Sequence, residues 1–158
     1  MRENVDLHRW RYFIYCLDQA LASLPTSHTN HVYRGVGLHF DVQGTYAEGS
    51  VVCWPAFSSS SVSQEVADDF IKLNTQTGEL RDGTVFIITP QSCKDIAMWS
   101  RFPREKEYLF PSNSRFQVIK NLGSATQKMI DVSSQIMELA EVTSEYITEL
   151  ELKAIVNS

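Results

Sequence analysis

The chain is poor in cysteine and has no apolar run long enough to span a bilayer, so no membrane segment is expected. Its three cysteines, Cys16, Cys53 and Cys93, are odd in number, and their spacing is neither CxxC nor that of a zinc site. They therefore imply no disulfide framework. Cys16 and Cys53 stand among apolar residues and are expected to be small buried side chains. The start of the chain lacks a signal-peptide pattern, so a secreted form would need a removed leader or another export route.

Positive charge is also scarce, with 14 Lys and Arg against 19 Asp and Glu and a formal net charge of −5. This balance argues against broad binding to nucleic acid or to an anionic membrane. The segment from Lys94 to Lys120 is different, because it holds six basic and three acidic residues, a local balance of +3. That excess favours a small anionic ligand in this region, although an ordinary mixed-charge surface has the same composition.

The length of 158 residues fits one domain over 1–158, and the 43% of apolar residues is ordinary for a globular protein. Neither an internal repeat nor a linker is evident. Because some strands look hairpin-joined, α+β fits better than a doubly wound parallel sheet. In chain order the patterns predict a helix over 6–24, strands over 31–37 and 51–57, a helix over 66–73, a strand over 84–89, a turn or helix over 94–99, strands over 106–110 and 115–120 joined as a hairpin, a helix over 124–141 and a strand over 145–155.

The first predicted helix carries a stripe of apolar and aromatic residues at helical spacing, and its simplest interpretation is a face buried in the core. The stripe consists of Leu7, Trp10, Phe13, Ile14, Leu17, Leu21 and Leu24.

Arg34 is the first residue whose pattern indicates function. It alternates with Val32 and Val36 in the strand over 31–37, and an arginine on an inward face is costly unless it meets an anion. Gly35 beside it lets a backbone or ligand approach closely. The alternative is an edge-strand arginine that points to water.

The second feature is a run of four serines over 58–61. It is either a flexible loop or a hydroxyl cluster at a strand end that also caps the next helix. The second interpretation fits better, because Ser61 and Gln64 have the spacing of a capping box.

The third feature is the pair Glu105 and Glu107. Side chains in a strand alternate faces, so both carboxylates would share one face, with Lys106 on the other. Such like charges repel, and a chain either leaves them on a solvated edge or uses them where positive charge develops in a reaction. A solvated edge is the commoner case.

Taken in order, the three features resemble the arginine–serine–glutamate class of mono-ADP-ribosyltransferases, which includes bacterial toxins and eukaryotic ecto-enzymes. Val-Tyr-Arg-Gly-Val at 32–36 looks like the first family motif, Trp-Pro-Ala-Phe-Ser-Ser-Ser-Ser at 54–61 like the second, and Arg-Phe-Pro-Arg-Glu-Lys-Glu-Tyr-Leu-Phe-Pro at 101–111 like the third. The resemblance covers about residues 7–120, whereas no family motif is recognised in 121–142.

Two departures from the family bear on where the protein acts. The family usually has several more helices before the one at 6–24, so the chain looks trimmed or minimal. The paired cysteines of the secreted animal members are absent, so the resemblance favours an intracellular enzyme or a bacterial effector delivered into a host cell.

The resemblance implies a fold of two roughly perpendicular β-sheets packed together with flanking helices, and NAD bound between them. It implies cleavage of the bond between nicotinamide and ribose in NAD, with transfer of ADP-ribose to a protein side chain. NAD is then a co-substrate, no metal is needed, and the partner is a protein acceptor.

Residue by residue, Glu107 is expected to hold the ribose 2′-hydroxyl and stabilise the positive charge on the ribose as nicotinamide leaves. Ser59 would orient Glu107 and the ribose. Arg34 would bind a phosphate or ribose oxygen, and the backbone of Gly35 would bond the nicotinamide amide.

Glu105 would decide which residue is modified. In this class a glutamate at this position accompanies arginine as the acceptor, whereas a glutamine accompanies asparagine or cysteine. Arg81 is expected to contact the pyrophosphate, on position and charge alone. Trp99 and Phe102 form either an apolar lip that selects the acceptor or part of the core. An NAD glycohydrolase without transfer and a non-catalytic NAD-binding or interaction domain are the alternatives, although intact Arg34, Ser59 and Glu107 argue against a degenerate domain.

Overall fold

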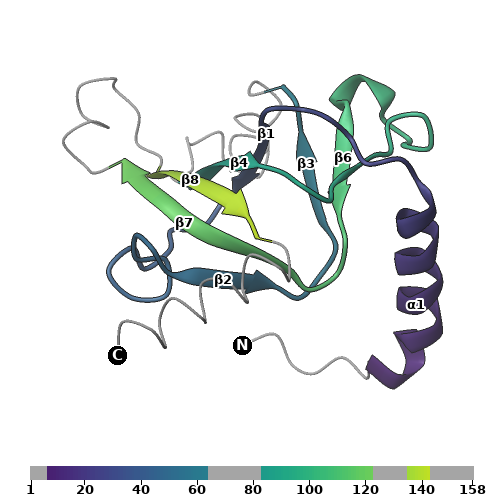
Figure 1. The fold of residues 1–158 in the computed structure, drawn as a ribbon, viewed down its shortest axis with the longest axis horizontal. Coiled ribbons are helices and arrows are strands. Elements are labelled where there is room, and N and C mark those ends of the chain that lie inside the picture. The colour runs from purple at the N-terminus through teal and green to yellow at the C-terminus, as the bar shows by residue number, and fades with distance from the viewer. Residues whose placement is uncertain (1–6, 64–82, 123–134, 143–158) are drawn as a thin grey trace, which may run out of the picture.

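The α+β class is confirmed in a computed structural model, which describes residues 7–63, 83–122 and 135–142. Within these residues one α-helix, α1 (Leu7–Ser23), stands beside a sheet of eight strands (Figure 1). The strands and a short 3-10 helix are β1 (Val32–Val36), β2 (Val51–Trp54), β3 (Ser58–Ser61), β4 (Thr84–Thr89), β5 (Lys94–Asp95), η1 (Pro103–Glu105), β6 (Glu107–Phe110), β7 (Ser114–Leu122) and β8 (Gln135–Glu141). No helix within the described residues is long and apolar enough to span a membrane.

The strands are hydrogen-bonded in the order β2-β7-β8-β4-β1-β3-β6-β5. The junction between β1 and β3 is narrow. These two strands pair at one position, Tyr33 opposite Ser61, whereas β1 and β4 pair at five positions. Figure 1 shows β3 and β6 running across the direction of β2 and β7. The two crossed sheets expected from the resemblance are therefore two halves of one hydrogen-bonded sheet. One half is β2-β7-β8-β4-β1 and the other is β3-β6-β5.

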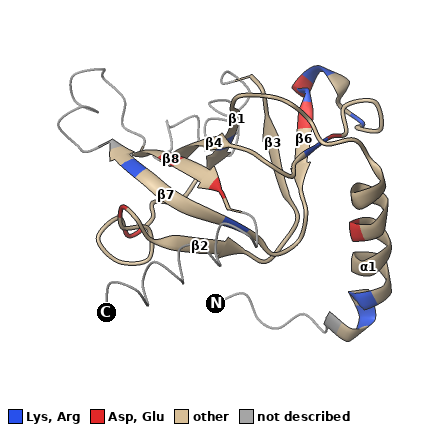
Figure 2. Ribbon diagram, viewed as in Figure 1, with Lys and Arg blue, Asp and Glu red and all other residues tan. Residues whose placement is uncertain are grey.

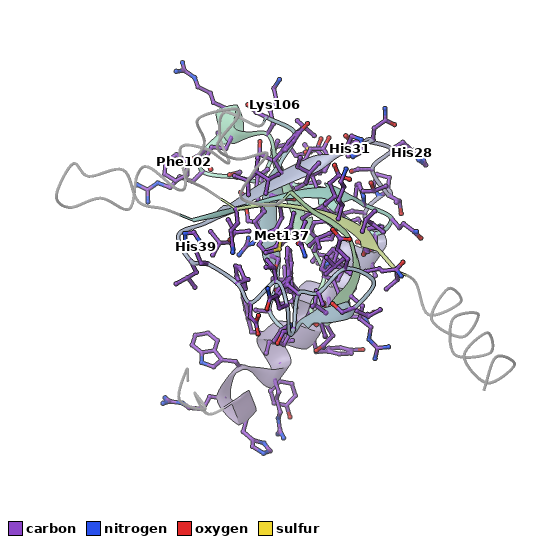
Figure 3. All side chains as sticks on the ribbon, turned by 90° about the vertical axis from the view of Figure 1, so that its left-hand side faces the viewer. His28, His31, His39, Phe102, Lys106 and Met137 are labelled. Carbon is purple, nitrogen blue, oxygen red and sulfur yellow. The ribbon has the colours of Figure 1, made fainter. Side chains whose placement is uncertain are left out.

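Aromatic rings hold the two halves together. Phe110 on β6 packs edge-on against Phe116 on β7, with ring centroids 5.1 Å apart, and Trp54 on β2 lies 4.3 Å from Phe116. Met137 on β8 lies near the middle of the molecule (Figure 3) and is fully buried. Such dense packing of large side chains fixes the angle between the halves and thereby places β1, β3 and β6.

The predicted hairpin between the strands at 106–110 and 115–120 is wrong. Strand β6 pairs with β3 and β5, whereas β7 pairs with β2 and β8. The connection contains Asn113 in the left-handed region at φ 59°, and it carries the chain from one half of the sheet to the other. The short polar connection resembles a hairpin turn in sequence, but β6 and β7 are not paired with each other and instead meet through the side chains of Phe110 and Phe116.

The helix predicted over 124–141 is wrong for residues 135–141, which form strand β8. This strand lies between β4, to which it is parallel, and β7, to which it is antiparallel. Met137 and Leu139 alternate inward and are almost fully buried. Ile136, Met137 and Ala140 fit the helical period, whereas Met137 and Leu139 fit the alternation of a strand, so pairing on both sides decides the outcome.

The serine run is neither a loop nor a strand end, because Ser58–Ser61 is itself strand β3. Its position between β1 and β6 overrides the weak strand propensity of serine. The hydroxyl of Ser60 donates to the carbonyl of Tyr108 at 3.1 Å, which compensates its burial. Ser61 Oγ accepts the N–H of Ser63 at 3.0 Å, and the helix that it was predicted to cap lies outside the described residues.

The helix predicted over 6–24 is confirmed as α1, but its stripe is not core. Trp10 and Phe13 are 53% and 59% exposed, and burial is reached only near the helix end at Leu21. Two hydrogen bonds hold the second half of α1 and the residue that follows it. Asp18 accepts the hydroxyl of Ser112, in the connection between β6 and β7, at 2.7 Å, and the carbonyl of Leu24 accepts Lys94 Nζ on β5 at 2.9 Å. In Figure 1 the start of α1 extends away from the strands, which leaves its aromatic residues exposed.

The predicted burial of two cysteines is also wrong, since Cys16 and Cys53 are exposed and Cys93 is buried. Cys16 lies on the exposed part of α1, and in β2 the buried neighbour is Val52. The segment predicted as a turn or helix at 94–99 begins with strand β5 and continues as a turn. The helix over 66–73, the strand over 145–155 and Arg81 lie outside the described residues.

Candidate active site

Three neighbouring strands bring the three sequence features together. Arg34 lies on β1, Ser59 on β3 and Glu107 at the start of β6, and these strands are adjacent in the sheet. Ser59 lies opposite Leu109, so Glu107 two residues away is its diagonal neighbour on the same face. The alternation of side chains along paired strands therefore places the hydroxyl and the carboxylate side by side.

Both oxygens of the Glu107 carboxylate accept hydroxyl hydrogen bonds. Ser59 Oγ donates to Oε1 at 2.6 Å, and Ser100 Oγ donates to Oε2 at 3.0 Å. The side chain of Glu107 is half-buried, which limits the competition from water for these bonds. The carboxylate is thus held in one orientation by a strand and by the loop before β6.

Sequence analysis missed Ser100. The residue follows an exposed tryptophan and precedes Arg101, and no hydrophobic period distinguishes it. Its proximity to Glu107 arises because the chain turns back between β5 and β6, so residues seven apart meet. A polar side chain within reach of the glutamate pair was the available signal.

Arg34 reaches across the junction between the two halves. Its Nη1 donates to the backbone carbonyl of Ser59, and its guanidinium lies 5.6 Å from the ring centroid of Trp54. Strand β1 is flanked by β4 and β3, so the alternative of an edge-strand arginine is wrong. Burial lowers the pKa of Arg34 from its usual value, yet a guanidinium stays charged in proteins. Its contacts here are a carbonyl and a ring, so the positive charge can still attract an anion.

Two aromatic residues support this arginine. Trp54 donates its Nε1 proton to the hydroxyl of Tyr46 at 3.0 Å. Burial raises the pKa of Tyr46, and the nearby Arg34 opposes that rise. The tyrosine therefore stays neutral at physiological pH and holds the indole that faces the guanidinium. The motif at 54–61 contained Trp54, but the part of Tyr46 was not predicted.

Glu105 does not lie on the same strand as Glu107. It ends the 3-10 helix η1, and Lys106 follows in the left-handed region at φ 45°. The prediction that alternation along one strand places both carboxylates is therefore wrong. Ser61 Oγ donates to the backbone carbonyl of Glu105 at 2.6 Å, which ties η1 to β3. Figure 2 shows acidic and basic residues next to one another at this end of β6.

Large apolar side chains are exposed on the loop before Glu105. Met98, Trp99 and Phe102 are 79%, 61% and 58% exposed, so core packing of Trp99 and Phe102 is wrong. Figure 3 shows Phe102 at the periphery of the molecule. Exposed aromatic and Met residues near a candidate site are typical of contacts with a protein partner.

Gly35 lies next to Arg34 on β1 and pairs with Val85 on β4. A cavity of about 570 Å³ lies elsewhere, lined by residues that include Tyr108, Asp95 and Trp99 but neither Ser59 nor Glu107. Tyr108 follows Glu107 in β6, so the two side chains point to opposite faces. The site at Glu107 is therefore distinct from this cavity.

Comparisons with known proteins agree with this arrangement. A family model described as NAD:arginine ADP-ribosyltransferase matches residues 1–138. Mav of Mycobacterium avium (strain 104), named an NAD(+)–arginine ADP-ribosyltransferase, is 35% identical over 65% of this chain and 11% of its own length. T-cell ecto-ADP-ribosyltransferase 1 of Rattus norvegicus is 32% identical over 77% of this chain and 41% of its own length. The structure of ADP-ribosyltransferase Vis in complex with agmatine has a TM-score of 0.69 at 23% identity, covering 90% of this chain and 66% of Vis.

The likeness to Vis concerns the fold. The chain spans between 11% and 55% of the length of the first three curated relatives that it matches. The matched part nevertheless contains all three strands that carry Arg34, Ser59 and Glu107.

Proposed function

Because the chain belongs to the NAD:arginine ADP-ribosyltransferase family, we propose that it transfers ADP-ribose from NAD to a protein arginine and releases nicotinamide. We propose further that residues 1–158 act as one catalytic domain. The observation that carries the proposal is the Glu107 carboxylate, bound by Ser59 on the strand next to Arg34. A fixed carboxylate on β6 and a half-buried cation on β1, with β3 between them, suit a substrate that carries phosphates and develops positive charge at its ribose.

Arg34 suits the binding of NAD. Its guanidinium is half-buried and keeps its charge. The carbonyl of Ser59 accepts a hydrogen bond from one of its nitrogens, and a phosphate or ribose oxygen of NAD would accept from another. The backbone of Gly35, next in the strand, would bond the nicotinamide amide. Arg81 lies outside the described residues, and its contact with the pyrophosphate stays a prediction.

Glu107 would act on the reacting ribose. The bond between C1′ and the nicotinamide nitrogen breaks with both electrons leaving on nicotinamide, and positive charge develops on the ribose. A carboxylate that already points at this position stabilises the charge without reorganising. The hydroxyls of Ser59 and Ser100 support such pre-organisation, because each binds a different oxygen of Glu107.

Glu105 would act on the acceptor. A guanidinium nitrogen forms the new bond to C1′ and must lose one proton, which a nearby carboxylate can accept. Glu105 ends η1 and its backbone is tied to β3 by Ser61, so it belongs to the rim of the same site without sharing the strand of Glu107. The exposed Trp99 and Phe102 on the same loop would contact the acceptor protein.

The alternative is an NAD glycohydrolase, in which water takes the place of the guanidinium. The half-buried Glu105 on the loop with exposed aromatic side chains favours transfer, because hydrolysis needs neither. The relatives include a bacterial protein and a rat ecto-enzyme. We propose that this chain acts inside a cell, or as a bacterial effector delivered into one.

The experiment uses NAD labelled in its adenosine moiety, the 158-residue chain and two acceptors, agmatine and a cell lysate. Agmatine is a small guanidine and was the ligand of the Vis structure. The proposal expects nicotinamide release, labelled agmatine, and labelled protein arginines identified by mass spectrometry. Nicotinamide release without labelled acceptor would establish the glycohydrolase, and absence of release would contradict both activities.

A further inference from the structure

We propose that Ser100 is a positioning residue that couples the Glu107 carboxylate to the loop bearing Glu105. This inference rests on the proposed function for its catalytic consequence. The coupling itself follows from contacts within the chain and can be measured without any activity.

The hydroxyl of Ser100 makes two bonds of opposite direction. It donates its single proton to Glu107 Oε2 at 3.0 Å and accepts the backbone N–H of Phe102 at 3.1 Å. A serine hydroxyl has one proton to give and lone pairs to accept, so both bonds can form at once. The same oxygen thus connects the carboxylate to the turn that leads into η1.

The backbone of Ser100 is also held in place. Its N–H donates to the carbonyl of Ile96 at 3.0 Å, and the N–H of Ile96 donates to the carbonyl of Glu107 at 3.0 Å. Ser100 is therefore fixed, through Ile96, to the backbone of the residue whose side chain it binds. The side chain of Ser100 is half-buried, which further limits its rotation.

Two hydroxyls acting together determine the orientation of the carboxylate. The terminal torsion of a glutamate is broad when nothing constrains it. Ser59 approaches Oε1 from strand β3, and Ser100 approaches Oε2 from the loop, so the carboxylate plane is fixed from two directions. Without Ser100, the carboxylate would keep only the hydrogen bond from Ser59 to Oε1, and its plane could rotate while that bond is kept.

The kinetic test compares Ser100→Ala, Ser100→Thr and the control Ser23→Ala. Ser23 is exposed at the end of α1, where its hydroxyl bonds the carbonyl of Ala20. Ser100→Ala should lower kcat for nicotinamide release at least about tenfold, the lower end of the effect of one lost hydrogen bond to a charged group, and leave KM for NAD unchanged. Ser100→Thr should restore kcat because it keeps the hydroxyl, and Ser23→Ala should match the wild type. Unchanged kcat in Ser100→Ala, or no recovery in Ser100→Thr, would overturn the catalytic role.

The coupling test measures amide hydrogen exchange over residues 97–105. Both Ser100→Ala and Glu107→Ala should accelerate exchange there, since each removes one side of the same hydrogen bond, whereas Ser23→Ala should not. Unchanged exchange in Glu107→Ala would overturn the coupling. A wild-type chain that releases no nicotinamide would refute the proposed function, and the exchange result would still decide whether Ser100 links the two segments.

Discussion

Replacing Arg34 with lysine separates the charge of this residue from its shape. Arg34 donates to the carbonyl of Ser59 and faces the ring of Trp54 at 5.6 Å. Lysine keeps the charge but loses the planar fork that can hold the Ser59 carbonyl and an oxygen of NAD at the same time. The variant is therefore expected to fold and to catalyse poorly.

The two contacts set the size of the effect. A hydrogen bond from a charged donor contributes about 1.5–3 kcal/mol, and a partly exposed cation–π contact about 0.5–1 kcal/mol. Because the lysine ammonium can still donate to one of the two oxygens, we expect a loss of about 2 kcal/mol, which is roughly 30-fold in kcat/KM for NAD cleavage. A similar loss of folding free energy would lower Tm by roughly 4–8 °C.

The assay measures nicotinamide release at a temperature well below the Tm of the variant, so that it stays folded. Arg9→Lys is the matched control, since Arg9 is exposed on α1, away from the site. A kcat/KM for Arg34→Lys equal to that of the control would show that positive charge alone suffices at this position and that the planar guanidinium is not needed.

Two further predictions concern selectivity and cysteine chemistry. Glu105→Gln should strongly reduce arginine labelling while slow NAD hydrolysis survives. Nicotinamide release and arginine labelling are measured on the same variant, and a parallel fall of both would assign Glu105 to NAD cleavage. Burial raises the pKa of the Cys93 thiol to about 12, so its reactive thiolate is scarce at neutral pH. A thiol reagent at pH 7.5 should therefore modify the exposed Cys16 and Cys53 in the native protein and Cys93 only after unfolding, and rapid native labelling of Cys93 would contradict its burial.

The grouping of Arg34, Ser59 and Glu107 on neighbouring strands was predictable, because these residues lie in short segments whose order along the chain is kept in the sheet. Strands β1, β3 and β6 carry Arg34, Ser59 and Glu107 and are neighbours in space. What the sequence did not reveal depends on tertiary pairing. Serine has no strong strand propensity, so β3 was recognised only as a motif and not as a strand.

Other errors have the same origin. Residues 135–141 satisfy a helical and a strand period, and the space between β4 and β7 selects the strand. The apolar face of α1 obeys the helical period, but periodicity shows which residues share a face and not whether another element covers it. Ser100 was missed because its contact with Glu107 depends on how the loop turns back.

We propose that the Glu107 carboxylate, held by Ser59 and Ser100, promotes the cleavage of NAD. The most direct test is nicotinamide release by Glu107→Gln, which keeps the size of the side chain and removes its charge. We expect a fall in kcat of about 10²–10³ or more, with both hydrolysis and arginine transfer lost and Tm close to that of the wild type. Nicotinamide release near the wild-type rate would contradict this proposal.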